Sequence, residues 1–406
     1  MRKLLAAGTV LLASMTVAAA EDASCLASPT RQCLLVMAAE ANVEAGKPVS
    51  GSDTGADANE WSLVVGETWG HIFEAAAKTG EPDFVLPYAP AAVKQFGTRG
   101  IPELIAALKL AGRDADLAAL LKQLAMDDRI ADNVFGPALV AGGRTDDFKA
   151  FAASRKYEPY NVVAMEAAGN FLSGKPTEGL ALIDALHGTF RKAAGINTLA
   201  ILLGTGHGDI AAPLVQYQDL GTVNGVEACA LVAQASKDKA LAEKCLAVAS
   251  PLSEAAARDG AYLYAVAPQL VGALAAVGDW QEGLTILRQL EPADRMTATA
   301  KLARFSHAPE ILPQARKALG SPGPEARKRG GFLVRMLVLA GQADEAARFV
   351  ATAPDDATRD DWNRLQAEAL AERGDLALAL PLAAHIANPA LRAYALCATA
   401  VALSIR

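Results

Sequence analysis

A recurring turn decides the fold of this chain, and one copy reads Gly278-Asp279-Trp280-Gln281-Glu282-Gly283. In each copy a glycine is followed by a short polar turn and by a small or apolar residue five positions after the glycine; a proline often stands about 14 positions after it. Glycine in the left-handed conformation closes one helix, the polar residue caps the next, and proline ends that second helix. The pattern therefore predicts helix pairs joined by short turns. Further copies begin at Gly80, Gly112, Gly143, Gly174, Gly208, Gly341 and Gly374.

The spacing of these glycines predicts a repeat of about 33 residues. From Gly80 to Gly208 successive glycines are 32, 31, 31 and 34 residues apart. The next two gaps, of 70 and 63 residues, are each close to two units, so we expect the missing turns near Lys237–Lys239 and His307–Glu310. Because one helix pair buries only part of its apolar surface, neighbouring pairs must stack. We therefore expect a right-handed α-solenoid of about ten stacked antiparallel helix pairs.

The composition also indicates an all-α fold. The chain is 52% hydrophobic but only 5% aromatic, and Ala and Leu prevail over the β-branched and aromatic residues that strands favour. Most of the 20 prolines and 33 glycines fall between apolar periodic stretches, where the ends of helices place them.

The second helix of these units resembles that of the tetratricopeptide-repeat superfamily. In that family it carries Gly, a polar residue, an aromatic residue, two variable residues and Ala, with Pro near the end of the unit. Gly278–Gly283 is similar, with Gly in place of Ala, and Gly374–Ala379 is similar without the aromatic residue. The family's Trp, Leu-Gly and Tyr series in the first helix is missing, and a HEAT-like repeat is the alternative. The resemblance covers roughly residues 65–406; it implies the architecture but not the family's peptide-binding residues.

The first 20 residues have the features of a secretory signal peptide. Two basic residues precede an apolar run from Leu4 to Val17, and three alanines stand before two acidic residues. An uncleaved membrane anchor is the alternative, but the run is short and rich in alanine. We expect a signal peptide at 1–20, an N-terminal segment with a first helix and a loop at 21–60, and a helical repeat domain at 61–406.

The N-terminal region contains two further patterns. Glu44–Asn59 is rich in Gly, Ser and Asp and predicts a flexible loop. Trp61, Val65, Trp69 and Phe73 then follow at spacings of four, which places them on one stripe of a helix. We expect this stripe to cover the open end of the solenoid, because terminal repeats need covering; an aromatic platform for a ligand is the alternative.

The charge balance makes two classes of partner unfavourable. Removal of Arg2 and Lys3 leaves 36 basic residues against 45 acidic ones, a net charge of −9. An acidic chain without basic clusters repels phosphate backbones and anionic lipid, so we expect no nucleic acid partner. No stretch after the signal peptide offers about 20 apolar residues without charge or proline, so we expect no membrane insertion of the mature chain.

The five cysteines predict two disulfides if the compartment is oxidising. Cys25 and Cys33 are eight residues apart and could hold the N-terminal segment on the first helix. Cys229 and Cys245 are equidistant from the polar turn at residue 237, so they lie at the same height on antiparallel neighbours, where Cα atoms can approach to about 6 Å. Two small buried thiols are the alternative for this pair. We expect Cys397 to be a buried free thiol.

The sequence shows no catalytic, metal-binding or cofactor-binding constellation. Five scattered histidines lack a second histidine three or four residues away, so a helical zinc pair is unsupported. Gly204–Asp209 is glycine-rich but lacks the lysine of a phosphate-binding loop and predicts an inter-helix turn. Ser236–Lys239 fits the S-x-x-K pattern of serine enzymes, but K-T-G and S-D-N do not occur elsewhere. Paired aspartates such as Asp355-Asp356 and Asp360-Asp361 are interpreted as solvated caps.

These observations favour a non-catalytic scaffold that binds an unknown protein or peptide, with no cofactor. A cell-envelope enzyme, or a subunit associated with one, is the first alternative. A structural, oligomerising subunit is the second. The signal peptide predicts export, and we favour the periplasm over secretion because the chain has neither a surface anchor nor a lipid-attachment site.

Overall fold

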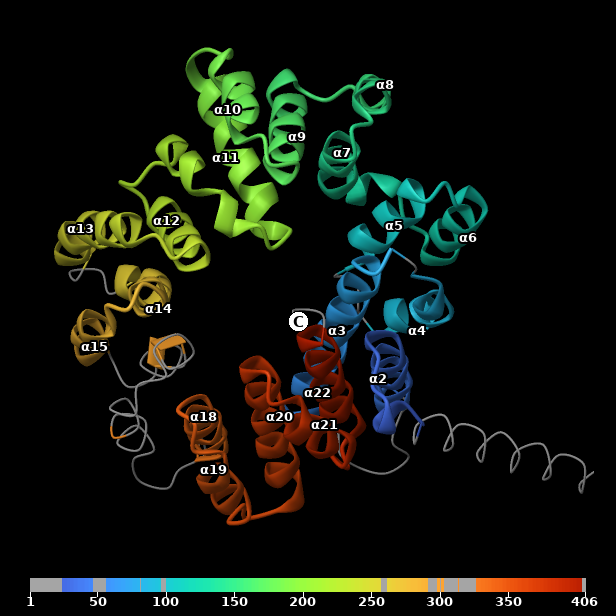
Figure 1. Cartoon of the computed structure of the whole chain (residues 1–406), viewed down its shortest axis with the longest axis vertical. Coiled ribbons are helices and arrows are strands. Elements are labelled where there is room, and N and C mark those ends of the chain that lie inside the picture. The colour runs from blue at the N-terminus through green and yellow to red at the C-terminus, as the bar shows by residue number, and fades with distance from the viewer. Residues whose placement is uncertain are drawn as a thin grey trace, which may run out of the picture. The chain divides into compact units, whose positions relative to one another are not determined.

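A computed structural model describes residues 24–46, 56–80, 82–95, 100–256, 261–290, 298–299, 301–302, 313 and 326–403. The predicted signal peptide at 1–20 and the turn expected near His307–Glu310 lie outside these residues. The described chain is all-α, and no strand occurs in it (Figure 1). It divides into two compact units: unit 1 comprises Met1–Asp127 and Ala343–Arg406, and unit 2 comprises Asp128–Gln342.

The helices of each unit have the following bounds. Unit 1 contains α2 (Arg31–Ala45), α3 (Ala56–Ala77), the 3-10 helix η1 (Pro82–Tyr88), α4 (Ala89–Lys94), α5 (Ile101–Leu110), α6 (Asp114–Leu124), α19 (Ala343–Val350), α20 (Asp356–Arg373), α21 (Leu376–Ala384) and α22 (Pro389–Ala402). Unit 2 contains η2 (Asp128–Ala131), α7 (Asp132–Ala141), α8 (Thr145–Arg155), α9 (Pro159–Leu172), α10 (Pro176–Asp184), α11 (Gly188–Gly204), η3 (Gly208–Ile210), η4 (Ala212–Tyr217), α12 (Val223–Ser236), α13 (Lys239–Ala256), α14 (Ala261–Ala276), α15 (Trp280–Gln289) and α18 (Ala326–Leu339).

Most of the predicted glycine turns are present and share one hydrogen-bond pattern. At Gly112, for example, φ is 66°, and the N–H of Arg113 donates to the carbonyl of Leu108 at 3.0 Å. This bond is the six-to-one bond of a Schellman motif, which satisfies a carbonyl that the end of a helix leaves open. The same bond and a left-handed glycine recur at Gly143, Gly174, Gly278, Gly341 and Gly374, with N···O distances of 2.8 Å.

The structure corrects one predicted turn glycine and confirms the turn predicted in one of the long gaps. Gly206, with φ of 81°, takes the left-handed position that the spacing assigned to Gly208, and the N–H of His207 donates to Leu202 at 2.7 Å. The reason is that α11 ends at Gly204, which puts the turn two residues earlier. In the expected turn near Lys237–Lys239, Lys237 is left-handed with φ of 53°, between α12 and α13.

The residue five positions after the turn glycine packs closely against a neighbour, as the pattern predicts. Phe148, Ala346 and Ala379 are fully buried. At Gly179 even a Cβ atom would lie 2.9 Å from the ring of Phe171. Leu117 differs from these residues because it is only half-buried.

In unit 2 the first helices of successive pairs lie side by side. α9 packs against α7, α10 and α11, and α12 packs against α13 and α14. After α11 the chain departs from the helix-pair pattern, because η3 and η4 stand where a second α-helix is expected. These short helices return the chain along α11 and bring Tyr217 onto it.

In unit 1 the N-terminal helix α2 and the C-terminal helix α22 pack together. α22 packs against α2, α3, α20 and α21, and Arg392 Nη2 lies 2.7 Å from Glu44 Oε2 (Figure 1). Both ends of the loop predicted at Glu44–Asn59 are helical, since α2 continues to Ala45 and α3 begins at Ala56; residues 47–55 lie outside the described part of the chain. Helix formers such as Ala45 and Ala56 extend the two helices into the polar stretch.

The aromatic stripe of α3 belongs to the core of unit 1. Val65, Trp69 and Phe73 are 0–5% exposed, and the two rings stack with centroids 5.7 Å apart. The Trp69 indole N–H donates to Gln95 Oε1 at 2.6 Å. These three side chains are therefore not an open aromatic platform. Trp61 lies on the same helix, but its side chain is outside the described part of the chain.

Membrane-spanning helices were sought along the described ranges, and none of their helices combines the length and the apolar character that crossing a bilayer requires.

Candidate functional site

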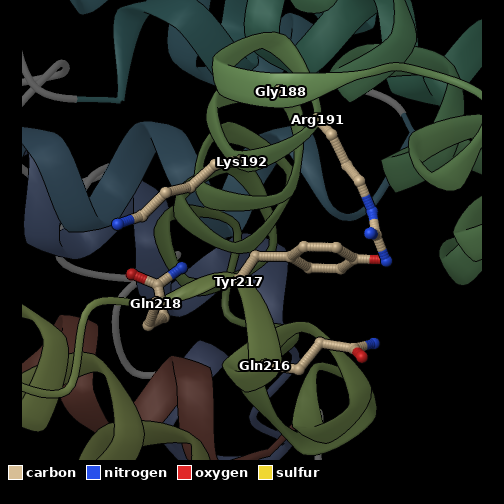
Figure 2. Close-up of a pocket in the computed structure, with 6 residues that line it drawn as sticks. All are labelled: Gly188, Arg191, Lys192, Gln216, Tyr217 and Gln218. Carbon is tan, nitrogen blue, oxygen red and sulfur yellow. The ribbon is translucent and has the colours of Figure 1, made fainter.

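A pocket of about 360 Å³ opens on unit 2 beside the first turn of α11. Figure 2 shows its lining: the Tyr217 ring, Arg191 and Gln216 lie to one side, and Lys192 and Gln218 lie to the other. The lining comes from only two segments, the start of α11 and the end of η4. The lining residues are Gly188, Arg191, Lys192, Gln216, Tyr217 and Gln218.

Two glycines give this region its shape. Gly188 has φ of 59°, a left-handed conformation that turns the chain from α10 into α11. Gly195 lies under Tyr217, where a Cβ atom would be 2.3 Å from the Cγ atom of the ring. Only glycine therefore allows the η4 segment to lie so close to α11, and this contact fixes the ring at the pocket wall.

A network around Asp184 fixes the Arg191 side of the pocket. Asp184 Oδ1 accepts hydrogen bonds from the Tyr217 hydroxyl at 2.7 Å and from Arg191 Nε at 2.9 Å, and Arg191 Nη2 lies 2.7 Å from the same oxygen. The guanidinium carbon lies 5.6 Å from the centroid of the Tyr217 ring, within the range of a cation–π contact. The Arg191 guanidinium is thus held by Asp184 at its Nε–Nη2 edge and by the Tyr217 ring.

The same contacts perturb the titration of two groups. The hydrogen bond from Tyr217, partly opposed by burial and reinforced by Arg191, lowers the pKa of Asp184. Burial, and then the hydrogen bond to Asp184, raises the pKa of Tyr217. At neutral pH the tyrosine is therefore protonated and donates, while the aspartate is ionised and accepts.

The other side of the pocket has a weaker ion pair and a donor that the chain does not use. Lys192 Nζ lies 3.5 Å from Asp219 Oδ2, and both side chains are more than half exposed. Gln218 Nε2 is buried without a hydrogen-bond partner in the described structure. A buried donor in this condition costs about 1–3 kcal/mol, and because the atom is buried a ligand in the pocket does not reach it.

An aromatic pair with one exposed ring involves the same turn of α11. Phe190 is 55% exposed, and its ring stacks on Tyr160 of α9 with centroids 5.8 Å apart. Most large apolar side chains of the described residues are buried, so this one is unusual. It places an apolar surface on the helix turn that also carries Arg191 and Lys192.

Sequence reasoning missed these pocket residues, although one signal was available. Acidic residues favour the first turn of a helix because of the helix dipole, and α11 has none there. Arg191 and Lys192 follow at the end of this turn instead. The residues that complete the site, Asp184 and Tyr217, are 33 positions apart, and no local pattern connects them.

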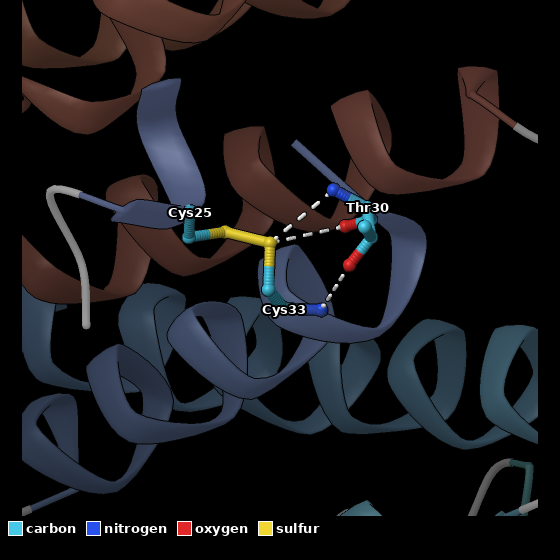
Figure 3. Close-up of a disulfide and its surroundings, with 3 residues drawn as sticks. All are labelled: Cys25, Thr30 and Cys33. Atoms are coloured by element: carbon cyan, nitrogen blue, oxygen red, sulfur yellow. Dashed lines mark hydrogen bonds between the residues drawn. A yellow bond between two sulfur atoms is a disulfide. The ribbon is translucent and has the colours of Figure 1, made fainter. Parts of the chain in front are cut away.

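The four cysteines predicted to be paired lie at disulfide-bonding distance. The Cys229 and Cys245 sulfur atoms are 2.06 Å apart, and their bond joins α12 to α13. The Cys25 and Cys33 sulfur atoms are 2.01 Å apart, and Figure 3 shows Thr30 beside them. The Thr30 hydroxyl caps α2 by accepting a hydrogen bond from Cys33 N at 3.1 Å. The two disulfides belong to different units, so they do not form one site.

Cys397 of α22 is buried and unpaired by any disulfide. Burial, and then the Glu74 carboxylate, raises the pKa of its thiol to about 12. The thiol is therefore protonated and unreactive at neutral pH, because the thiolate is the nucleophile.

The other sequence-derived candidates have structural roles. Gly204–Asp209 forms the turn after α11, as predicted, and Lys237 lies in the turn inside the S-x-x-K stretch. Within the described ranges, no group of three or more His, Cys, Asp or Glu side chains could hold a metal ion. Asp355 is a cap, since its carboxylate accepts from Thr358 N at 2.6 Å.

Asp360 and Asp361 differ from the predicted solvated caps. Asp360 accepts a hydrogen bond from Asn388 N at 2.7 Å and so joins α20 to the start of α22. Asp361 is only 16% exposed at its side chain and lies 2.9 Å from the Arg364 guanidinium. The prediction failed because Asp360 reaches the N-cap of α22 and Asp361 is largely buried in a pair with Arg364, which the local sequence does not specify.

Arg364 forms a second cluster of charged groups, in unit 1. It is paired with Asp361 and Glu368, and its guanidinium carbon lies 5.4 Å from the Tyr394 ring centroid. Burial disfavours its charge, but the carboxylates outweigh burial and hold the pKa of Arg364 above its usual range. Burial, and then Glu368, raises the pKa of Tyr394 to about 12. In this cluster the guanidinium is therefore paired with carboxylates of the chain itself.

Comparison with known proteins gives no family for this chain: no family model matches it, and neither does any curated protein.

Proposed function

We propose that this chain is an exported, non-catalytic binding protein that holds a peptide segment of a partner protein in the unit 2 pocket. One observation carries the proposal: the first turn of α11 carries both the half-exposed Arg191 and Lys192 of the pocket and the exposed Phe190 ring. Peptide segments supply both backbone acceptors and side chains that cover an aromatic surface.

The helix pairs support the same proposal. We infer that within each unit the pairs stack as an α-solenoid, because Schellman turns recur at near-constant spacing and first helices lie side by side. Such stacking produces extended surfaces that suit peptide segments. The disulfides favour an oxidising compartment, and together with the N-terminal sequence they support export to the periplasm.

Selection from a library of random peptides, with the folded chain from residue 21 onward as bait, tests this function. We expect defined peptides to be enriched and their binding to weaken when Phe190 is replaced by Ser. The matched control is Leu378→Ser, because Leu378 is a similarly exposed apolar side chain, 58% against 55%, but belongs to unit 1. Failure of the folded bait to enrich any peptide, or equal weakening by the two variants, would contradict the proposal.

A further inference from the structure

We propose that the pocket recognises a carboxylate of the bound peptide, and that the free edge of the Arg191 guanidinium holds it. This inference rests on the proposed peptide-binding function and adds the chemical class of the recognised group.

The first argument is the geometry of Arg191. A guanidinium has five N–H donors and two edges that can form paired hydrogen bonds. Asp184 Oδ1 lies against one edge, 2.9 Å from Nε and 2.7 Å from Nη2. Apart from the Nη2 contact with Asp184 and a hydrogen bond with the Tyr217 hydroxyl, the edge formed by Nη1 and Nη2 has no partner among the described residues. Its geometry matches the two oxygens of a carboxylate.

The second argument is that this edge is both accessible and held in place. The Arg191 side chain is 48% exposed. Asp184 holds it from one side and the Tyr217 ring lies beneath it, so little side-chain freedom remains to be lost when a ligand binds. Figure 2 shows the Tyr217 hydroxyl directed toward the guanidinium and the Gln216 amide close to the same end of the pocket.

The third argument concerns the balance of donors and acceptors in the lining. Asp184 Oδ1 already has several donors around it, and Asp219 Oδ1 accepts a hydrogen bond from Gly221 N at 3.1 Å. The charged groups with hydrogen-bonding capacity left are donors: the Arg191 edge, and the Lys192 ammonium, which has three N–H groups and one aspartate beside it. The ligand must therefore supply acceptors.

The charge of the lining favours a carboxylate over a phosphate. Each of the two cations in the pocket has one aspartate close to it, so the local charges nearly cancel. A singly charged carboxylate needs one guanidinium edge, whereas a doubly charged phosphate needs an excess of positive charge that this pocket lacks.

The carboxylate can come from two places in a peptide, its C-terminus or an Asp or Glu side chain. The test uses synthetic versions of the peptides enriched by selection: one with a free C-terminus, one with an amidated C-terminus, and one with Asn or Gln at the acidic positions. Dissociation constants are measured by fluorescence polarisation. We expect one of the two neutralised versions to bind at least about tenfold more weakly, and which one it is identifies the source.

Variants of the protein test whether Arg191 is the group that binds the peptide carboxylate. Arg191→Gln should weaken the acidic peptide by about tenfold or more, and Arg191→Lys should recover little, because lysine lacks the two-donor edge. Arg144 is the matched control: it belongs to the same unit, is 47% exposed and is paired with one aspartate, but it does not line the pocket. Arg144→Gln should leave binding unchanged, and far-UV circular dichroism should show all variants folded.

Four results would overturn the inference. Equal binding of the neutralised and acidic peptides would exclude carboxylate recognition while leaving the peptide-binding function intact. Equal effects of Arg191→Gln and Arg144→Gln would place the carboxylate elsewhere. Displacement of the acidic peptide by low millimolar inorganic phosphate, but not by acetate, would show that the pocket takes phosphate instead. An absence of any peptide ligand would overturn the function and the inference together.

Discussion

Each compact unit contains an arginine that lies over a tyrosine ring beside a carboxylate, and the two clusters differ in what remains unused. Arg364 in unit 1 has two carboxylate partners and is 18% exposed. Arg191 in unit 2 has one carboxylate partner and is 48% exposed. The same three residue types therefore form a closed, internally paired cluster in one place and a partly open cluster in the other. The number of carboxylates and the exposure of the guanidinium distinguish them.

The largest expected effect is a difference in stability loss between substitutions of Arg364 and of Arg191. Arg364→Met leaves Asp361 and Glu368 largely buried without the guanidinium, so we expect a loss of about 3 kcal/mol in the free energy of unfolding. Arg191→Met removes an exposed pair and should cost less than about 1 kcal/mol. Urea unfolding followed by far-UV circular dichroism measures both. Equal losses would mean that exposure does not separate the clusters.

The next effect concerns the glycine that lets Tyr217 reach its position. Gly195→Ala should destabilise the protein by about 1–3 kcal/mol and abolish peptide binding, because the added Cβ would overlap the Tyr217 ring. Gly204→Ala is a control on the same helix, since nothing lies within 4 Å of its Cβ position. It should be neutral or slightly stabilising, as alanine favours helices over glycine. A similar loss in both variants would show that Tyr217 is not held by this contact.

The contrast between these glycines and the turn glycines shows what the sequence could predict. Turns follow local rules, so Gly112 or Gly374 could be recognised from one short stretch, and Lys237 from the gap in the spacing. The Cys229–Cys245 pair followed from its symmetry about such a turn. Gly208 was misplaced because three glycines in six residues offer several positions for one turn.

The rest of the fold and the site depend on contacts between segments far apart in the chain. Asp184 reaches Tyr217 only because η3 and η4 replace a second helix, and a repeat period describes the regular units rather than such a departure. The packing of α2 on α22, with Glu44 beside Arg392, joins residues 348 positions apart. A repeated local pattern does not specify which distant helices meet.

A smaller effect appears only at high pH and belongs to the buried cluster. Because the pKa of folded Tyr394 is about 12 and that of an unfolded tyrosine about 10, the folded state keeps this proton longer. Its contribution is fully present below pH 10 and is lost as the pH rises toward 12, by up to about 1.4 kcal/mol per pH unit. Tyr394→Phe should therefore flatten the fall in unfolding free energy over this range.

Tyr88 supplies a control for this pH dependence. Burial, and then Glu40, also raises its pKa to about 12, so Tyr88→Phe should remove a separate part of the fall. Because different groups perturb the two pKa values, the effects of Tyr394→Phe and Tyr88→Phe should add. Urea unfolding measured at intervals between pH 9 and pH 12 gives the slopes. An unchanged slope in Tyr394→Phe would remove the evidence that this ring is shielded by the cluster.

The smallest expected effect comes from removing the charge of Asp219, which pairs with Lys192 in the pocket. Asp219→Asn removes the partner of Lys192 but keeps the oxygen that accepts from Gly221 N, so stability should change by less than about 0.5 kcal/mol. The freed ammonium should tighten binding of an acidic peptide by about two- to threefold, and more at low salt. Glu178→Gln is the control, because Lys175 and Glu178 form a similarly exposed pair outside the pocket. If both variants tightened binding equally, the gain would reflect the net charge of unit 2. That result would contradict a direct contact between Lys192 and the acidic peptide.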